Sequence, residues 1–297
     1  MGDELFIPGA KFRRLSSLTA AVHTEGGTAV VCQSTGMANS PSGDSMAERI
    51  VRVISAFDAE RPAMPVALLA RRAGLPLSTA HRLAGELVSL GLLQRTTSGE
   101  LRLGLRLWEL ASRSSSALDL RQVAMPFMED IQAVIRQHTQ LSVLQEDEVL
   151  FIERLSSRGS VSNFAKVAGR LPLHISSSGM VLMAHSPRHV QEEFLMRHRD
   201  APRPFPAADV LRRQWAEIRR EGCATLPGVV DPDTTGIAVP VFGPEGSAVA
   251  ALGVVVPRGR ENTAATVPAL MTAARGISRG LGTAASEAGP RNEGPAD

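Results

Sequence analysis

The sequence lacks several features that would each indicate a particular class of protein. No apolar run approaches the ~18 residues that cross a bilayer, and the N-terminus lacks the basic-then-apolar order of a signal peptide. Cys32 and Cys223 lie far apart, so neither a disulfide framework nor a CxxC metal site is indicated. We therefore expect a cytoplasmic protein with no membrane segment.

The motifs of common enzyme classes are also missing. The chain has no GxSxG or SxxK motif, no Walker loop and no dinucleotide fingerprint. His185 and His189 have the i, i+4 spacing that can hold a metal on a helix, but Pro187 between them is expected to break that helix. We therefore expect no enzyme, no catalytic residues, no metal site and no cofactor.

Lysine is nearly absent, and arginine supplies almost all of the positive charge. Lys11 and Lys166 are the only lysines, and the net charge of +2 is too small to indicate nucleic acid. From Met46 to Arg106, however, nine arginines stand against five acidic residues, a net charge of +4. A codon bias would explain many arginines but not their clustering. Guanidinium groups suit bidentate contacts with phosphate or guanine.

The length and the apolar content indicate two folded domains with loose ends. The chain has 297 residues, of which 43% are hydrophobic, which is enough for two packed cores. Residues 1–44 show no periodic pattern and are expected to be disordered, as are residues 285–297. Met37, ahead of the first periodic helix, is a candidate translation start.

Residues 45–106 begin with the pattern of three short helices. Ser45-Met-Ala-Glu48 fits a capping box, and the apolar spacing carries the first helix to about Glu60. Pro65 suits the first position of a second helix, and Ser78 is placed to cap a third.

After these helices the pattern changes to that of a β-hairpin. Two short strands, 92–96 and 100–103, flank Thr97-Ser98-Gly99, which suits a turn. Helix, helix-turn-helix and hairpin together predict a winged helix-turn-helix domain over 45–106. A linker helix is expected over 107–117.

The third predicted helix carries the residues that indicate DNA binding. Its apolar stripe leaves polar side chains on the opposite face, near the N-terminal end that enters the major groove in helix-turn-helix proteins. Serine and threonine hydroxyls and the amides at a helix start bind phosphate, and an arginine guanidinium can reach the edge of a guanine base. Arginines on the hairpin can contact the DNA backbone. Any one of these polar residues alone is explained by a helix face that contacts only solvent. Their combination with the positive charge and the hairpin favours DNA binding. The expected DNA-binding residues are Ser78, Thr79, His81, Arg82, Arg95 and Arg102.

The remainder of the chain predicts an α+β domain over 118–284, in which helices flank an antiparallel sheet. Helices are expected at about 119–138, 177–185, 187–198, 208–221 and 263–284. Strands are expected at about 141–145, 149–154, 237–242 and 248–256.

Segments of both domains resemble the IclR family of transcription regulators. The resemblance covers about residues 46–284, and it is specific as a combination although each piece is short. In the DNA-binding domain the matching segments are LLARRAGLP (68–76), STAHRL (78–83), LGLLQR (90–95) and LRLG (101–104). In the effector-binding domain they are LDLR (118–121), GRLPLH (169–174), Ser178-Gly179, IAVPVF (237–242) and residues 250–252.

This resemblance implies a dimer or tetramer that binds double-stranded operator DNA and a small organic effector. The C-terminal domain would be GAF-like, with its ligand cavity between residues 173–179 and the sheet that contains Ile237. Serine hydroxyls and helix-start amides suit a carboxylate or carbonyl group, although capping explains any single serine equally well. The expected effector-binding residues are Ser176, Ser177, Ser178 and Gly236.

Three departures from the family pattern affect these expectations. Leu77 stands where many relatives have a lysine, so one DNA contact is expected to be absent. Leu226 and Pro227 occupy positions that are often acidic, which predicts a less polar cavity. Asp231 and Asp233 either add polarity there or, as we favour, form a turn around Pro232.

The alternative reading is an enzyme or sensor for a small molecule or metal, whose winged helix contacts protein rather than DNA.

Overall fold

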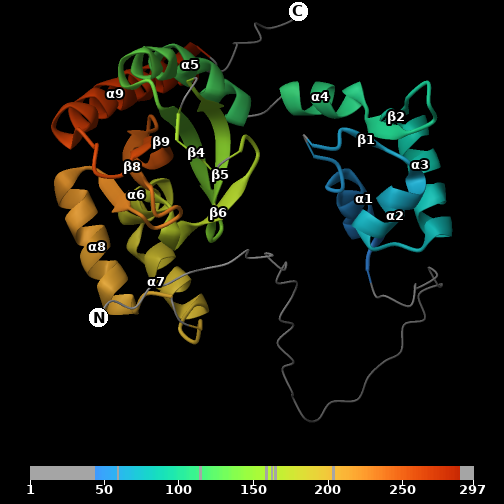
Figure 1. Cartoon of the computed structure of the whole chain (residues 1–297), viewed down its shortest axis with the longest axis horizontal. Helices are drawn as coiled ribbons and strands as arrows, with labels where there is room; N and C mark the ends of the chain where they lie inside the picture. The colour runs from blue at the N-terminus through green and yellow to red at the C-terminus, as the bar shows by residue number, and fades with distance from the viewer. Residues whose placement is uncertain are drawn as a thin grey trace, which may run out of the picture. The chain divides into compact units, whose positions relative to one another are not determined.

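The computed structural model describes residues 44–287 except 59, 114–115, 158–159, 162, 164–165 and 203–204. The N-terminal tail up to residue 43, with Cys32 and Met37, and the tail beyond residue 287 lie outside the described residues. The chain divides into two compact units (Figure 1). One contains residues up to Leu87 and Arg95–Leu103, and the other contains Val88–Gln94 and the chain from Gly104 onward.

The first part of the described chain is a winged helix-turn-helix. Its strands form a three-stranded sheet in the order β1-β3-β2, and the buried apolar faces of its helices form the core. The elements are α1 (Met46–Ile54), β1 (Ala63–Met64), α2 (Val66–Ala73), α3 (Leu77–Ser89), β2 (Leu93–Arg95) and β3 (Leu101–Leu103). The fully buried side chains include Val53, Leu69, Leu83, Leu87, Leu93 and Leu101.

Two helix ends differ from the sequence predictions. The capping box of α1 is confirmed, but α1 ends at Ile54 rather than near Glu60. The carboxylate of Asp58 accepts hydrogen bonds from the backbone N–H groups of Glu60 and Arg61 at 3.0 and 2.8 Å, and this local turn replaces the helix. Ser78 does not cap α3, because the helix already begins at Leu77.

The second part of the chain is an α+β unit, as predicted. Its early elements are α4 (Leu105–Ser112), α5 (Ser116–Ile135), β4 (His138–Gln145), β5 (Glu148–Leu155), β6 (Arg170–Pro172) and the 3₁₀ turn η1 (Leu173–Ile175). The later ones are α6 (Ser177–His185), α7 (Arg188–Arg197), α8 (Ala208–Glu221), β7 (Ala224–Pro227), β8 (Thr234–Phe242), β9 (Ala248–Pro257) and α9 (Thr263–Glu287). Pro187 separates α6 from α7, as expected. The short strands β6 and β7 were not predicted.

One six-stranded antiparallel sheet, in the order β6-β5-β4-β9-β8-β7, forms the centre of this unit. Successive strand residues face opposite sides, so β8 supplies Ile237 and Val239 to the core beneath α5 and α9, and Ala238 to the core beneath α6 and α8. Figure 1 shows the two helical layers on either side of the sheet. Gly276 and Gly280 let α9 approach α5 closely, because an added Cβ would meet the side chains of that helix.

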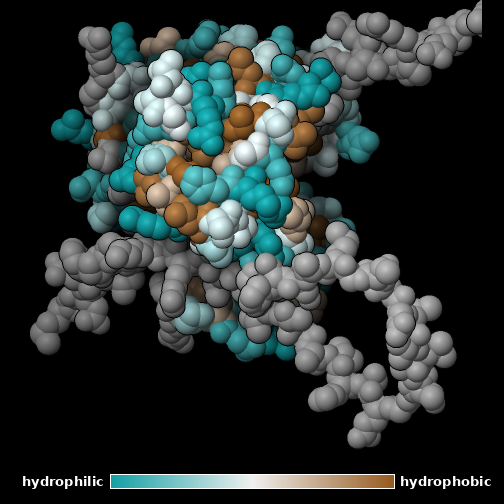
Figure 2. All heavy atoms as spheres, turned by 90° about the vertical axis from the view of Figure 1, so that its right-hand side faces the viewer, coloured by the Kyte–Doolittle hydropathy of each residue, from teal (hydrophilic) through white to brown (hydrophobic). Residues whose placement is uncertain are grey.

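The expected linker helix corresponds to α4, which begins before residue 107 and ends at Ser112. Several of its apolar side chains are exposed: Leu105 is 75% and Trp108 is 68% accessible. Figure 2 shows hydrophobic side chains reaching the surface among hydrophilic ones. Exposed large apolar groups gathered on one short helix are typical of an interaction surface.

No helix in the described ranges is long and apolar enough to cross a membrane.

A buried histidine at the start of β4 makes the stability of this unit dependent on pH. His138 lies with Nδ1 2.9 Å from the Ser156 hydroxyl and Nε2 2.6 Å from the Val161 carbonyl. Because a carbonyl only accepts, Nε2 donates and the neutral ring receives a hydrogen bond from Ser156. Burial lowers the pKa of His138 below its ordinary value of 6.5, with Arg154 adding to the effect. The folded state therefore favours the neutral ring.

We expect the free energy of unfolding to fall as the pH drops below about 6.5. In that range the unfolded chain binds a proton that folded His138 does not, so the stabilisation is complete above pH 6.5 and is lost toward the folded-state pKa. Urea unfolding followed by the fluorescence of buried Trp215, between about pH 7.5 and pH 5, measures it. His138→Gln should flatten the profile, and an unchanged profile would contradict the assignment. Burial lowers the pKa of His174 too, so the free energy of unfolding of the His138→Gln variant should still depend on pH to some extent.

Candidate DNA-binding face and effector cavity

The exposed face of α3 carries most of the predicted DNA-binding residues. Ser78, His81 and Arg82 are exposed and Thr79 is half-buried. The opposite face packs into the core through Ala80, Leu83, Ala84 and Leu87. The structure therefore places the four polar residues where a partner could reach them.

Arg82 already has an ion-pair partner within the helix. Its Nη1 lies 2.6 Å from Oε1 of Glu86, one turn further along, and both side chains are about half exposed. A guanidinium has five N–H donors, so this contact leaves Arg82 able to bind a phosphate or a base edge. The pair also holds the side chain along the exposed face.

The two remaining predicted residues, Arg95 and Arg102, lie on the β2–β3 hairpin. Both are exposed, and Arg95 donates from Nη1 to the carbonyl of Gly99 at 3.3 Å. Gly99 has a φ of +83°, so the turn requires a residue that tolerates this conformation. The hairpin thus presents its arginines on two strands joined by a turn of defined conformation.

A cavity lies where the start of α6 meets the sheet of the second unit. All four predicted effector-binding residues line it, together with residues of β4, β5, β9 and the β7–β8 loop. The volume of this cavity that the centres of water molecules can occupy is about 50 Å³. One water needs ~10–15 Å³ of such volume, so the cavity has room for several. The lining is Gln140, Phe151, Asn163, Leu171, Ile175, Ser176, Ser177, Ser178, Leu226, Val230, Asp231, Thr234, Gly236 and Val255.

Two glycines allow α6 to begin so close to the sheet. A Cβ on Gly236 would lie 2.9 Å from the Ser177 hydroxyl, and one on Gly179 would lie 2.8 Å from the side chain of Val149 in β5. Such approaches need the absence of a side chain.

The three serines have different roles at this helix start. Ser176 is the N-cap of α6, and its hydroxyl oxygen accepts from the Gly179 N–H at 3.4 Å, so the capping explanation applies to it. Ser177 and Ser178 belong to the first turn, where the helix dipole favours negative charge. Ser178 is 3% exposed and Ser177 is half-buried.

Gln140 is a cavity residue that the sequence analysis missed. It lies opposite Gly253 of β9, two residues from Val255, which in turn lies opposite Gly236. All of these positions therefore face the same side of the sheet. The side chain is 6% exposed, and its Oε1 has no hydrogen-bond partner among the described residues. A buried acceptor of this kind costs free energy unless water or a ligand satisfies it.

The β7–β8 loop adds one acidic group to the cavity. Asp231 lines the cavity, and its Oδ1 also accepts from the backbone N–H of Asp233 at 2.9 Å. The predicted turn around Pro232 is thus present, and Asp231 contributes polarity as well. Leu226 lines the same wall, as expected of a less polar cavity.

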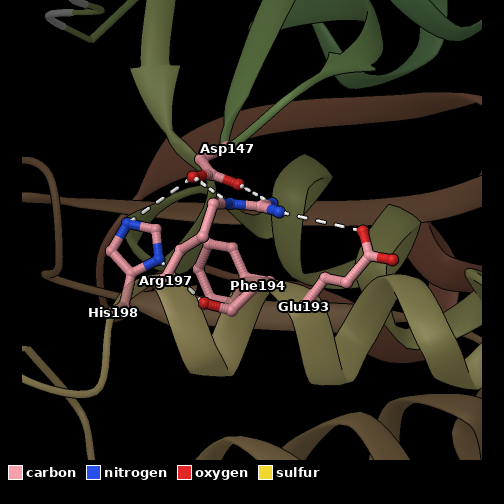
Figure 3. A network of polar contacts seen from close by, with 5 residues as sticks. All are labelled: Asp147, Glu193, Phe194, Arg197 and His198. Carbon is pink, nitrogen blue, oxygen red and sulfur yellow. Dashed lines mark hydrogen bonds and ion pairs between the residues drawn. The ribbon is translucent and has the colours of Figure 1, made fainter. Parts of the chain in front are cut away.

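An ion-pair network fixes the segment that leads into α6. Asp147, in the β4–β5 turn, binds Arg197 of α7 through two hydrogen bonds of 3.1 and 2.5 Å (Figure 3). The carbonyl of Asp147 accepts from the N–H of Leu173, the first residue of η1, at 3.0 Å. His198 lies beside the pair, with Nε2 3.8 Å from the carboxylate. The hairpin, α7 and η1 therefore hold the serine segment in place.

No group of three or more His, Cys, Asp or Glu side chains that could hold a metal ion occurs in the part of the chain that the structure describes.

A winged helix-turn-helix joined to an α+β unit with a small-molecule cavity defines a ligand-responsive transcription regulator. The sequence patterns of the IclR helix-turn-helix domain and of the bacterial transcriptional regulator IclR C-terminal domain match residues 46–97 and 113–279. The chain belongs to the IclR family of transcription regulators.

Relatives and solved structures agree with this assignment. The HTH-type transcriptional regulator KdgR of Dickeya chrysanthemi is 28% identical over 249 residues, covering 82% of this chain and 81% of that protein. An IclR homologue from Microbacterium hydrocarbonoxydans, solved with 4-hydroxybenzoate, is 48% identical with a TM-score of 0.73, covering 80% of this chain and 99% of that one. A putative regulator from Rhodococcus sp. RHA1 is 26% identical with a TM-score of 0.67, covering 80% and 98%. These relatives do not favour the alternative of an enzyme or a metal sensor.

Proposed function

We propose that this regulator responds to a small aromatic carboxylate of the size of 4-hydroxybenzoate. The ligand would occupy the cavity at the start of α6 and alter the affinity for double-stranded operator DNA. The observation that carries the proposal is that α6 hydroxyls, apolar side chains and a buried acceptor line one cavity together, and that this acceptor has no hydrogen-bond partner among the described residues. The relative solved with 4-hydroxybenzoate supports the same ligand class.

The chemistry of the lining suits the parts of such a ligand. The hydroxyls of Ser177 and Ser178 and the amides of the first turn of α6 would bind the carboxylate. Phe151, Leu171 and Val255 offer apolar contacts to a ring, and Gln140 Oε1 would accept from a ligand hydroxyl. Ser176 and Gly236 would shape the site, the first by capping and the second by leaving space.

The DNA contacts are proposed to come from α3 and the hairpin, with Ser78, Thr79, His81, Arg82, Arg95 and Arg102 as the contacting residues. The exposed apolar side chains of α4 support a homo-oligomer, a dimer or tetramer, because large apolar groups gathered on one helix are typical of an interaction surface. A dimer would present two winged helices to two half-sites. We propose that the protein acts in the cytoplasm, where its operator lies.

A thermal-shift comparison of three probes tests the ligand class. We expect 4-hydroxybenzoate to stabilise the second unit, by about 2.7 kcal/mol at 100 times its dissociation constant. Benzoate should stabilise it less because it lacks the hydroxyl for Gln140, and 4-hydroxybenzyl alcohol should stabilise it least because it lacks the carboxylate. If neither carboxylate raises the melting temperature, the proposed ligand class is wrong.

A further inference from the structure

Gly85 lies in the interior of α3, on its exposed face. An added Cβ at this position would meet no heavy atom within 4 Å in the described chain. Glycine is among the least favourable residues in a helix interior, and no close approach by any part of the chain that the structure describes requires a glycine at this position. A residue with a side chain would fit the free protein and would stabilise α3.

The neighbours of Gly85 on the helix are the proposed DNA-binding residues. Ser78, His81, Arg82 and Gly85 have the spacing i, i+3, i+4, i+7, which places them along one face of an α-helix. The residues that homeodomain recognition helices present to the major groove have the same spacing. The core-facing side chains of α3, among them Leu83 and Leu87, lie on the other face. Gly85 therefore belongs to the strip that would face the duplex.

We infer that Gly85 is a gap in the recognition face at which the duplex comes against the backbone of α3. The inference rests on the proposed DNA-binding role of this face. A helix without a Cβ at one position allows a bound partner to approach its backbone more closely there. The gap would let Ser78 and Arg82, which precede it on the same face, reach into the groove. The glycine thus lowers the stability of α3 in the free protein and allows a closer fit to DNA in the complex.

The test uses Gly85→Ala and Gly85→Leu in the full chain. The probe is a duplex of about 30 base pairs selected from a randomised pool by repeated binding to the wild-type protein. Both variants should raise the melting temperature of the winged helix-turn-helix, by roughly 4 °C, because alanine and leucine favour helix. The affinity for the duplex should fall about tenfold for alanine and further for leucine. Its dependence on salt should not change, because no charge is removed.

Gly282 of α9 provides a matched control. It is also a helical glycine with no atom of the described chain within 4 Å of an added Cβ, and it lies outside the proposed DNA-binding face. Gly282→Ala should leave the affinity for the duplex unchanged. An unchanged affinity in the Gly85 variants, with Arg82→Ala losing binding, overturns the inference and keeps the DNA-binding face. If the wild-type protein selects no duplex, the DNA-binding face and this inference both fail.

Discussion

Replacing Arg82 by alanine should weaken operator binding severely while leaving the response to effector intact. A bidentate contact to a base is worth ~1–3 kcal/mol, and a dimer would lose it in both half-sites, which lowers affinity by at least about thirtyfold. If Arg82 binds phosphate instead, the affinity should fall for all sequences and its slope against salt concentration should decrease. Binding assays on a selected duplex at several salt concentrations separate the two roles.

Stability should hardly change in this variant. The Arg82–Glu86 pair is about half exposed on both sides, and exposed pairs contribute little. Arg213 of α8 is a suitable control, because it forms a comparable exposed pair with Asp209 at i, i+4, with Nη1 2.9 Å from the carboxylate. Arg213→Ala should bind DNA as the wild type does. Equal DNA affinity in the Arg82 and Arg213 variants would remove α3 from the proposed contact surface.

Replacing Gln140 by methionine should have opposite effects on the free and the liganded protein. Without ligand, the buried Oε1 of Gln140 has no partner among the described residues, and removing such an acceptor recovers about 1 kcal/mol or more of stability. Methionine has a similar volume, so little cavity or strain is introduced. With 4-hydroxybenzoate, the variant should lose the part of the thermal shift that depends on the ligand hydroxyl.

The comparison of ligands makes this prediction specific. For the Gln140 variant, 4-hydroxybenzoate and benzoate should give equal shifts, whereas the wild type should distinguish them. Gln122→Met, at an exposed position of α5, is the control and should keep the wild-type difference. A wild-type difference that survives Gln140→Met would show that another group binds the hydroxyl.

The fold could be predicted largely because its main elements are periodic. The spacing of apolar residues and the capping box at Ser45 identified the helices of the winged helix-turn-helix, and Pro187 correctly marked the break between α6 and α7. The errors have local causes. The turn around Asp58 ends α1 early through two side-chain hydrogen bonds, which apolar spacing does not reveal. Strands β6 and β7 have three and four residues, too few for an alternating pattern to be recognised.

The candidate effector site was only partly predictable. The Ser176–Ser178 segment and Gly236 were expected from family resemblance, and the structure places all four around one cavity. Gln140 was missed because its position depends on strand pairing. It reaches the cavity only because β4 pairs with β9 and sets it opposite Gly253, and such a register between distant segments leaves no mark near residue 140.

The local excess of arginine and the short helices followed by a hairpin were enough to predict a DNA-binding domain, whereas the sensing role of the second domain was predicted mainly from the resemblance to the IclR family. These features are local, and period, capping and charge act over a few neighbouring residues. Tertiary structure alone decided which residues share the candidate effector cavity, that Gln140 Oε1 has no partner there among the described residues, and that none of them comes close to Gly85. Each of these depends on how segments far apart in the chain pack, because burial and hydrogen bonding are properties of the assembled sheet and helices.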